Sequence, residues 1–226
     1  MRILVTVSLV LFLTSGQGLA KVSVSPVIIE ATNVKKGDTF QVWCEQDGTT
    51  PLDIHLSLAL FDQNEDGSVY FLEDPHSIQR AGKVLSLGQE QLSLAPQGKS
   101  VLEIEVLQDD FTSFYAVLFV KPEQSALHTR FAVLLLLSTE GLEDEMRVSA
   151  WEHREQNLEL TIVNDGSRHG LWQGELLLYD NQGNLGEKRS VQSGVVLAGR
   201  SREWGITLPA WVVKVELTTS VQGVER

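Results

Sequence analysis

The segment that comes closest to a chemical motif is 62–73, which has the spacing of an EF-hand calcium loop. Carboxylate and amide oxygens recur at alternate positions, Gly67 provides for a sharp turn, and Glu73 stands where a two-oxygen ligand is needed. An EF-hand needs a helix on each side, but residues 54–61 alternate like a strand and Pro75 is expected to break an exiting helix. We therefore predict a solvated hairpin turn, with calcium binding as the alternative.

Other motifs of catalysis or metal binding do not occur in the sequence. The five histidines are scattered without ligand spacing, and there is neither a Gly-x-Ser-x-Gly turn nor a glycine-rich phosphate loop. Cys44 is the only cysteine, which excludes an intramolecular disulfide. It falls on the same face of its strand as Phe40 and Val42, as a small buried hydrophobe would. We predict no catalytic residue, no metal site and no cofactor, and hence a protein that is not an enzyme.

The five tryptophans are the remaining candidates for ligand contact. Packing in the core and between domains explains their irregular spacing, and an aromatic platform for sugars is the alternative. They are Trp43, Trp151, Trp172, Trp204 and Trp211.

The first twenty residues have the order of a secretory signal peptide. Arg2 precedes an apolar run over residues 3–13, and small residues lead to Ala20, after which we predict cleavage. The run is too short to span a bilayer, so we predict a periplasmic or otherwise extracytoplasmic protein without a stable membrane anchor. The net charge of −12 repels polyanions, which makes nucleic acid an unsuitable partner.

The rest of the chain consists of short runs in which apolar and polar residues alternate, separated by glycine, proline and aspartate turns. Seven such runs within residues 21–140 are typical of an immunoglobulin-like β-sandwich. The predicted strands are 22–29, 39–45, 54–61, 84–94, 101–106, 115–120 and 131–137.

An acidic, glycine-containing stretch at 138–145 indicates a hinge, after which a second immunoglobulin-like sandwich is predicted for residues 145–226. The two halves align without a gap, residues 40–44 with 158–162 and residues 58–61 with 176–179, while 96–100 has a counterpart in 198–201. We therefore predict an all-β chain of two copies of one sandwich. The strands predicted in the second copy are 147–151, 158–163, 174–179, 194–197, 203–208 and 212–218.

The order of these features resembles the periplasmic pilus-assembly chaperones, which are exported proteins of two immunoglobulin-like domains. The matching segments are 24–30 followed by Gly37, 94–100, 115–122 and the apolar strand 131–137. The resemblance covers residues 22–138, and the second domain is similar to the sandwich that often follows. It implies partners among other exported proteins, such as the subunits of surface fibres.

In that family the last strand of the first domain offers alternate apolar residues to an incomplete subunit. The resemblance assigns this partner-binding role to Val133, Leu135 and Leu137, and the opposite row, Leu134 and Leu136, is the alternative. A strand wholly within the core is a further alternative, because residues 133–137 are apolar on both sides. If the assignment holds, a charged residue at Val133 or Leu135 abolishes partner binding without unfolding the domain.

The family also uses two basic residues to grip the terminal carboxylate of the subunit. Ile28 stands at the first of these positions and Leu136 or a neighbour at the second, so both basic residues are missing. The predicted function is therefore that of a divergent chaperone-like or assembly-accessory protein that binds other exported proteins. The alternative is a surface adhesion or carbohydrate-binding module.

Overall fold

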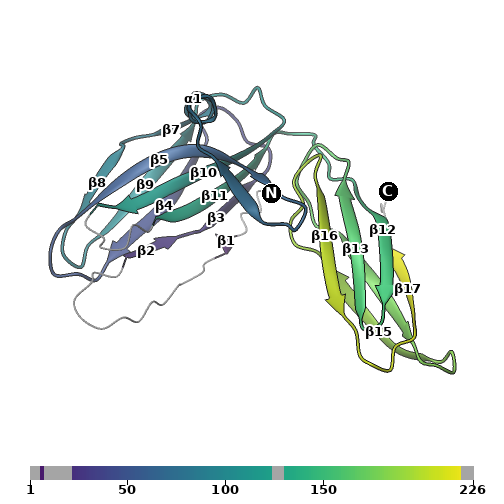
Figure 1. The fold of residues 1–226 in the computed structure, drawn as a ribbon. Helices are drawn as coiled ribbons and strands as arrows, with labels where there is room; N and C mark the ends of the chain where they lie inside the picture. The colour runs from purple at the N-terminus through teal and green to yellow at the C-terminus, as the bar shows by residue number, and fades with distance from the viewer. Residues whose placement is uncertain (1–5, 8–21, 124–129, 220–226) are drawn as a thin grey trace. The chain divides into compact units, whose positions relative to one another are not determined.

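The computed structural model describes residues 6–7, 22–123 and 130–219, which fold as two compact units (Figure 1). The first unit comprises Met1–Asp62 and Phe71–Gly141, and the second comprises Gln63–Tyr70 and Leu142–Arg226. The predicted signal peptide lies outside the described residues except for Thr6 and Val7. No helix within the described ranges is long and apolar enough to cross a bilayer.

The first unit is a sandwich of two β-sheets. One sheet has the strand order β1-β3-β11-β10-β5-β6, with β8 also paired to β5, and the other has the order β2-β4-β9-β7. The predicted strand 22–29 is split between the two sheets at Pro26, which has no N–H for a ladder. The strands are β1 (Thr6–Val7), β2 (Val22–Ser25), β3 (Ile28–Ala31), β4 (Thr39–Gln46), β5 (Leu52–Gln63), β6 (Val69–Leu72), β7 (Leu85–Leu87), β8 (Gln91–Leu94), β9 (Lys99–Val106), β10 (Ser113–Pro122) and β11 (Phe131–Ser138).

The alternating residues of the predicted strands fill the space between these two sheets. On β4, Val42 and Cys44 are fully buried, and they share a core with Leu56 of β5 and Ile104 of β9. The prediction that Cys44 packs as a small hydrophobe is therefore confirmed. Burial raises the pKa of its thiol to about 12, so the group stays protonated and unreactive at neutral pH.

The first unit also contains a helix, α1 (Pro75–Val84), which the sequence pattern did not predict. The carboxylate of Asp74 accepts hydrogen bonds from the backbone N–H groups of His76 and Ser77 at 3.0 and 3.1 Å, and so caps the first turn. Pro75 stands at the start of the helix, where no backbone N–H is needed. Pro75 therefore begins a helix instead of breaking one, and the predicted strand 84–94 is wrong: it spans the end of α1, β7 and β8.

The second unit is a smaller sandwich of two three-stranded sheets, ordered β12-β13-β16 and β15-β14-β17. Leu158, Leu160 and Ile162 of β13 face Leu176 and Leu178 of β14 across its core. The predicted class, two immunoglobulin-like sandwiches in tandem, is thus confirmed. The strands are β12 (Met146–Arg154), β13 (Asn157–Asn164), β14 (Gln173–Tyr179), β15 (Leu185–Gln192), β16 (Ser201–Thr207) and β17 (Lys214–Thr219).

Two details of the second unit differ from the prediction. The predicted strand 194–197 is wrong, because Val196 forms only an isolated bridge with Gly170. Strand β15 was not predicted, and its residues are mostly exposed. A strand with so few buried side chains has no apolar alternation by which a sequence could reveal it.

The predicted hairpin at residues 62–73 is confirmed, since the turn joins β5 to β6. The carboxylate of Asp66 accepts hydrogen bonds from the backbone N–H of Ser68 at 2.8 Å and from its hydroxyl at 2.6 Å. Gly67 adopts a φ of 83°, which suits glycine best. The carboxylate of Asp66, one of the groups that resembled calcium ligands, therefore stabilises the turn.

The tip of this hairpin, Gln63–Tyr70, is part of the second unit. There the side-chain amide of Gln63 donates a hydrogen bond to the carbonyl of Val195 at 2.8 Å and accepts one from the N–H of Leu197 at 3.1 Å. A long hairpin from one predicted domain thus supplies part of the other.

Candidate functional site

The three residues assigned to partner binding lie in the core of the first unit. Val133, Leu135 and Leu137 of β11 are all fully buried and pack among the inward-facing residues of both sheets. While the sandwich is closed, a partner cannot contact them, and a charge at any of them is expected to unfold the unit. Their assignment to a partner therefore requires β11 to leave the sandwich, and it stays a prediction.

The opposite face of the same sheet is apolar as well. Leu134 and Leu136 of β11 neighbour Val117 and Tyr115 of β10, and Val117 in turn neighbours Ala59 of β5. None of these residues belongs to the two hydrophobic clusters that fill the sandwiches, yet Ala59, Val117 and Leu136 are buried as well. We call this set the outer layer: Ala59, Phe61, Tyr115, Val117, Phe119, Leu134 and Leu136. A sheet that is apolar on both faces needs a covering layer on each.

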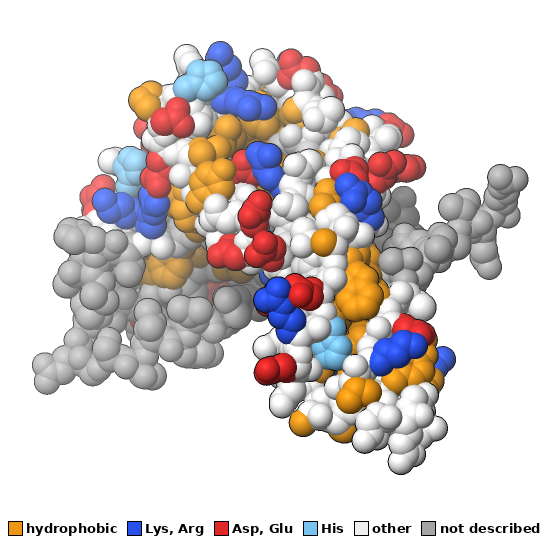
Figure 2. Space-filling model, turned by 45° about the vertical axis from the view of Figure 1, so that its right-hand side comes forward, with side chains coloured by type: hydrophobic (Ala, Val, Ile, Leu, Met, Phe, Trp, Pro, Cys, Tyr) orange, Lys and Arg blue, Asp and Glu red, His pale blue; other side chains and the backbone are white. Residues whose placement is uncertain are grey.

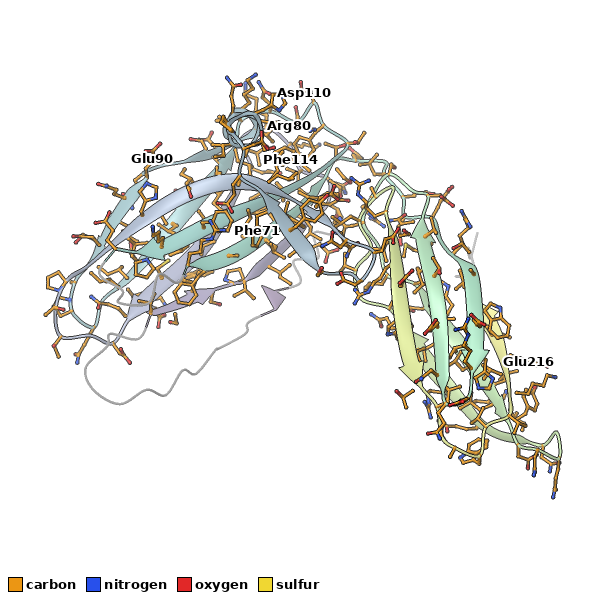
Figure 3. All side chains as sticks on the ribbon, in the orientation of Figure 1. Phe71, Arg80, Glu90, Asp110, Phe114 and Glu216 are labelled. Atoms are coloured by element: carbon orange, nitrogen blue, oxygen red, sulfur yellow. The ribbon has the colours of Figure 1, made fainter. Side chains whose placement is uncertain are left out.

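One end of the outer layer is covered by β6 and by Arg130. Phe71, which Figure 3 labels, meets Phe119 edge to face with ring centroids 5.0 Å apart. The guanidinium of Arg130 lies 3.7 Å from the centroid of Phe119. Arg130 also donates two hydrogen bonds, of 2.5 and 2.6 Å, to the carboxylate of Glu73. These hydrogen bonds hold the pKa of Glu73 below its usual range, so its carboxylate stays ionised to a lower pH than that of a free glutamate.

At the other side of β11, β3 runs parallel to it and brings Ile28 next to Leu134 and Glu30 next to Leu136. The two positions at which the family resemblance implies basic residues therefore lie on neighbouring strands and on one face of the sheet. They carry apolar side chains, and the nearest charge on the same row is the carboxylate of Glu30. This part of the face therefore suits an apolar segment.

The outer edge of β3 pairs only with β1 among the described strands, through Thr6 opposite Ile29 and Val7 opposite Ile28. Because β1 falls within the predicted signal peptide, cleavage after Ala20 would remove it. The edge of β3 would then offer unpaired backbone groups to another strand.

The tryptophans divide into buried and exposed members. Trp172 is buried in the core of the second unit and packs edge to face with Trp204, with ring centroids 6.5 Å apart. Trp151 of β12 and Trp211 are 48% and 42% exposed and lie by different sheets, since Trp211 rests against Gly186 of β15. The core-packing interpretation is thus confirmed for Trp172.

The structure brings together no group of three His, Cys, Asp or Glu side chains that could hold a metal ion, as far as residues 6–7, 22–123 and 130–219 are concerned. Acidic and basic side chains are interspersed on the face that Figure 2 shows, without a large field of one sign. The face shown therefore presents no basic patch of the kind that binds a polyanion.

Comparison with known proteins gives a fold rather than a close relative. No protein-family model matches the chain, and no curated protein matches it by sequence. Its structure is similar to that of the class 5 fimbriae chaperone CfaA, with a TM-score of 0.57 and 10% identity over 91% of this chain and 95% of the other. It is also similar to a chain of the chaperone–tip adhesin complex of CFA/I fimbriae biogenesis, with a TM-score of 0.55 and 9% identity over 88% and 98% of the two chains.

A third similar structure is a chain of the CsuC–CsuE chaperone–tip adhesion subunit pre-assembly complex, from the archaic chaperone-usher Csu pili of Acinetobacter baumannii. Here the TM-score is 0.50, with 13% identity over 82% of this chain and 90% of the other. Each likeness extends over both units. The chain therefore has the fold of the pilus-assembly chaperones.

Proposed function

We propose that this chain is an exported, non-enzymatic chaperone-like or assembly-accessory protein that binds other extracytoplasmic proteins during the assembly of pili or related surface structures. The observation that carries the proposal is the row of Ile28 and Leu134, two half-buried apolar side chains on the outer face of the sheet, where most of the outer layer is already buried. The likeness to fimbrial chaperones supports the same role at the level of the fold.

The partner segment we propose is an extended, apolar strand. Strand addition needs an open edge for backbone hydrogen bonds and an apolar row for alternate side chains. The outer edge of β3 supplies the first once the export signal is gone, and Ile28 with Leu134, both half-buried, supplies the second. Because the two basic residues of the family are missing, partner affinity depends on apolar contact and backbone pairing instead of on the partner's terminal carboxylate.

The test is affinity purification of the tagged mature protein from the extracytoplasmic fraction of its own cells, followed by mass spectrometry. We expect a stoichiometric exported protein that is unstable alone. Leu134→Lys should lose it while keeping the wild-type circular dichroism spectrum. Val101→Lys is the matched control, because Val101 is an exposed apolar residue on β9 of the other sheet.

Retention of the partner by a folded Leu134→Lys variant would remove the outer layer from the proposal. Recovery of polysaccharide in place of a protein would transfer support to an adhesion or carbohydrate-binding module.

A further inference from the structure

A groove of 350 Å³ lies in the first unit beside β9. Strand β7 pairs with β9 as far as Leu87, and the chain then departs through Gly88 and Gln89. Glu90, which Figure 3 labels, accepts at its carbonyl a hydrogen bond of 2.8 Å from the N–H of Leu56 on β5. The segment after β7 is thus attached to the other sheet, and the groove lies where this segment leaves β9. The groove shares no residue with the outer layer.

Outward-facing side chains of β4 and β9 form one wall of this groove. In the register of the two strands, Gln41 stands opposite Glu103 and Trp43 stands opposite Val101. Val42 is fully buried, so its neighbours Gln41 and Trp43 emerge on the outer face of the sheet. Gln41, Val101 and Glu103 line the groove directly. Trp43 extends the wall, because side chains directly opposite each other on paired strands lie within contact distance.

Two of these side chains form a planar polar pair. The side-chain amide of Gln41 donates a hydrogen bond to the carboxylate of Glu103 at 3.3 Å. Both side chains are exposed, and neither has another hydrogen bond or ion pair within the described part of the chain. The amide oxygen of Gln41 and the second carboxylate oxygen of Glu103 are therefore able to accept hydrogen bonds from a ligand. Beside this pair, Val101 is 41% exposed and Trp43 is half-buried, so an apolar surface adjoins the acceptors.

The chemistry of this lining restricts what the groove can bind. Among the described residues, no lysine, arginine or histidine lines it, so an anionic ligand would meet Glu103 without a compensating charge. A wholly apolar ligand would cover Gln41 and Glu103 without giving them hydrogen bonds. The lining therefore favours a ligand with an apolar face for Trp43 and Val101 and a rim of neutral hydroxyl donors.

We propose that this groove binds a neutral pyranose sugar, as a hexose unit of a glycan. The C–H face of the sugar ring lies against the indole of Trp43 and the side chain of Val101, and its hydroxyls donate hydrogen bonds to the acceptors of Gln41 and Glu103. A volume of 350 Å³ is near the lower end of the range of small-molecule sites, which suits a ligand of this size. The sugar site goes beyond the proposed function, because it uses residues of the other sheet.

The probes are three neutral disaccharides, cellobiose, lactose and mannobiose, each added at millimolar concentration to the mature protein. Saturation-transfer NMR reports binding. At least one of the disaccharides should bind, with the strongest transfer to the C–H protons of one ring face. A counterpart of the bound sugar that contains a uronic acid unit should bind about 10-fold more weakly, because its carboxylate would meet Glu103.

Glu103→Gln should weaken sugar binding by about 10-fold, because it removes a charge-assisted hydrogen bond while keeping the shape of the side chain. Glu105→Gln is the matched control and should bind the sugar like wild type. Glu105 is an exposed carboxylate on the same face of β9, and it does not line the groove. Trp43→Phe should remove most of the change in tryptophan fluorescence that the sugar causes. Circular dichroism checks that each variant is folded.

The proposal is overturned if none of the three disaccharides binds, or if Glu103→Gln binds the sugar as tightly as wild type. It is also overturned if spermidine, a linear polyamine, displaces the sugar and so shows that the groove takes cations. Val101→Lys places a long charged side chain in the groove and should lose the sugar but keep the exported partner, whereas Leu134→Lys should do the reverse. The sugar site and the partner-binding role can therefore fail separately.

Discussion

The two units use the same kind of sheet but cover it differently. On β14 of the second unit, Leu176 and Leu178 are buried while Leu177 between them is half-exposed, so one face is covered. On β10 of the first unit, residues 116–120 are buried without a break. Among the described residues, only the first unit therefore has a sheet that is covered on both faces, and we propose that a partner adds beside it, at the half-buried row of Ile28 and Leu134.

The two units share one feature, a buried side-chain amide at the end of the aligned strands β4 and β13. Gln46 of β4 and Asn164 of β13 stand at aligned positions of the repeat. Each donates a side-chain hydrogen bond of 3.0 Å to a main-chain carbonyl, Leu94 in the first unit and Val196 in the second. The duplication thus extends from the strand pattern to individual hydrogen bonds. The amide oxygens differ: that of Asn164 accepts two backbone N–H groups, whereas that of Gln46 has no donor among the described residues.

The largest expected effect comes from aspartate substitutions that test the two faces. Leu135→Asp and Val117→Asp, on opposite faces of the first sheet, should each destabilise the protein by more than about 4 kcal/mol, because both bury a charge. In the second unit Leu178→Asp should do the same, but Leu177→Asp should cost less than about 1 kcal/mol because its side chain faces outward. Urea unfolding followed by circular dichroism measures all four.

This comparison fails if Val117→Asp is tolerated as well as Leu177→Asp. If Leu135→Asp folds normally and loses only its partner, the row Val133, Leu135 and Leu137 regains the partner-binding role that the family resemblance implies.

A smaller effect is expected from removing the two amides. Asn164→Ala should cost about 3 kcal/mol and Gln46→Ala about 2 kcal/mol, because the first leaves both donors and acceptors unpaired and the second only acceptors. The unfolding free energies of the two variants in urea decide the order. An equal or larger loss for Gln46→Ala would show that the amide oxygen of Asn164 contributes nothing to stability.

The smallest effect concerns Cys44, whose aligned residue in the second unit is Ile162, a side chain that cannot titrate. The thiol ionises near pH 9.0 in the unfolded chain and only near 12 when buried. Stability is thus complete below about pH 9 and is lost as the pH rises toward about 12, by about 1.4 kcal/mol at about pH 10. Cys44→Val should remove the loss of stability that the thiol causes at alkaline pH. Urea unfolding curves of the wild type and the variant, at a pH below about 9 and at about pH 10, measure the difference. Identical pH dependences would contradict the prediction.

Much of the fold was predictable because strands, turns and the repeat leave local signals. Alternating residues located β4, β5, β9, β13 and β14, and glycine with aspartate marked the turns. Elements without such signals were missed. Strand β15 is largely exposed and carries Glu187, Lys188 and Arg189, charges that protect an edge but hide a strand. Helix α1 was missed because a proline is expected to end a helix. Only the hydrogen bond by which Asp74 caps the first turn shows that Pro75 stands at the start of one.

The candidate site shows the same division. By itself, the sequence determined that residues 133–137 are apolar on both sides and that no basic residue stands at position 28. The sequence could not determine which row faces the core. In a strand whose residues are all apolar, no alternation distinguishes the side chains of one face from those of the other. Packing against the facing sheet decided that Val133, Leu135 and Leu137 point inward. Tertiary structure alone also brought Gln63 to Val195, since a hydrogen bond between residues so distant along the chain leaves no local signal in the sequence.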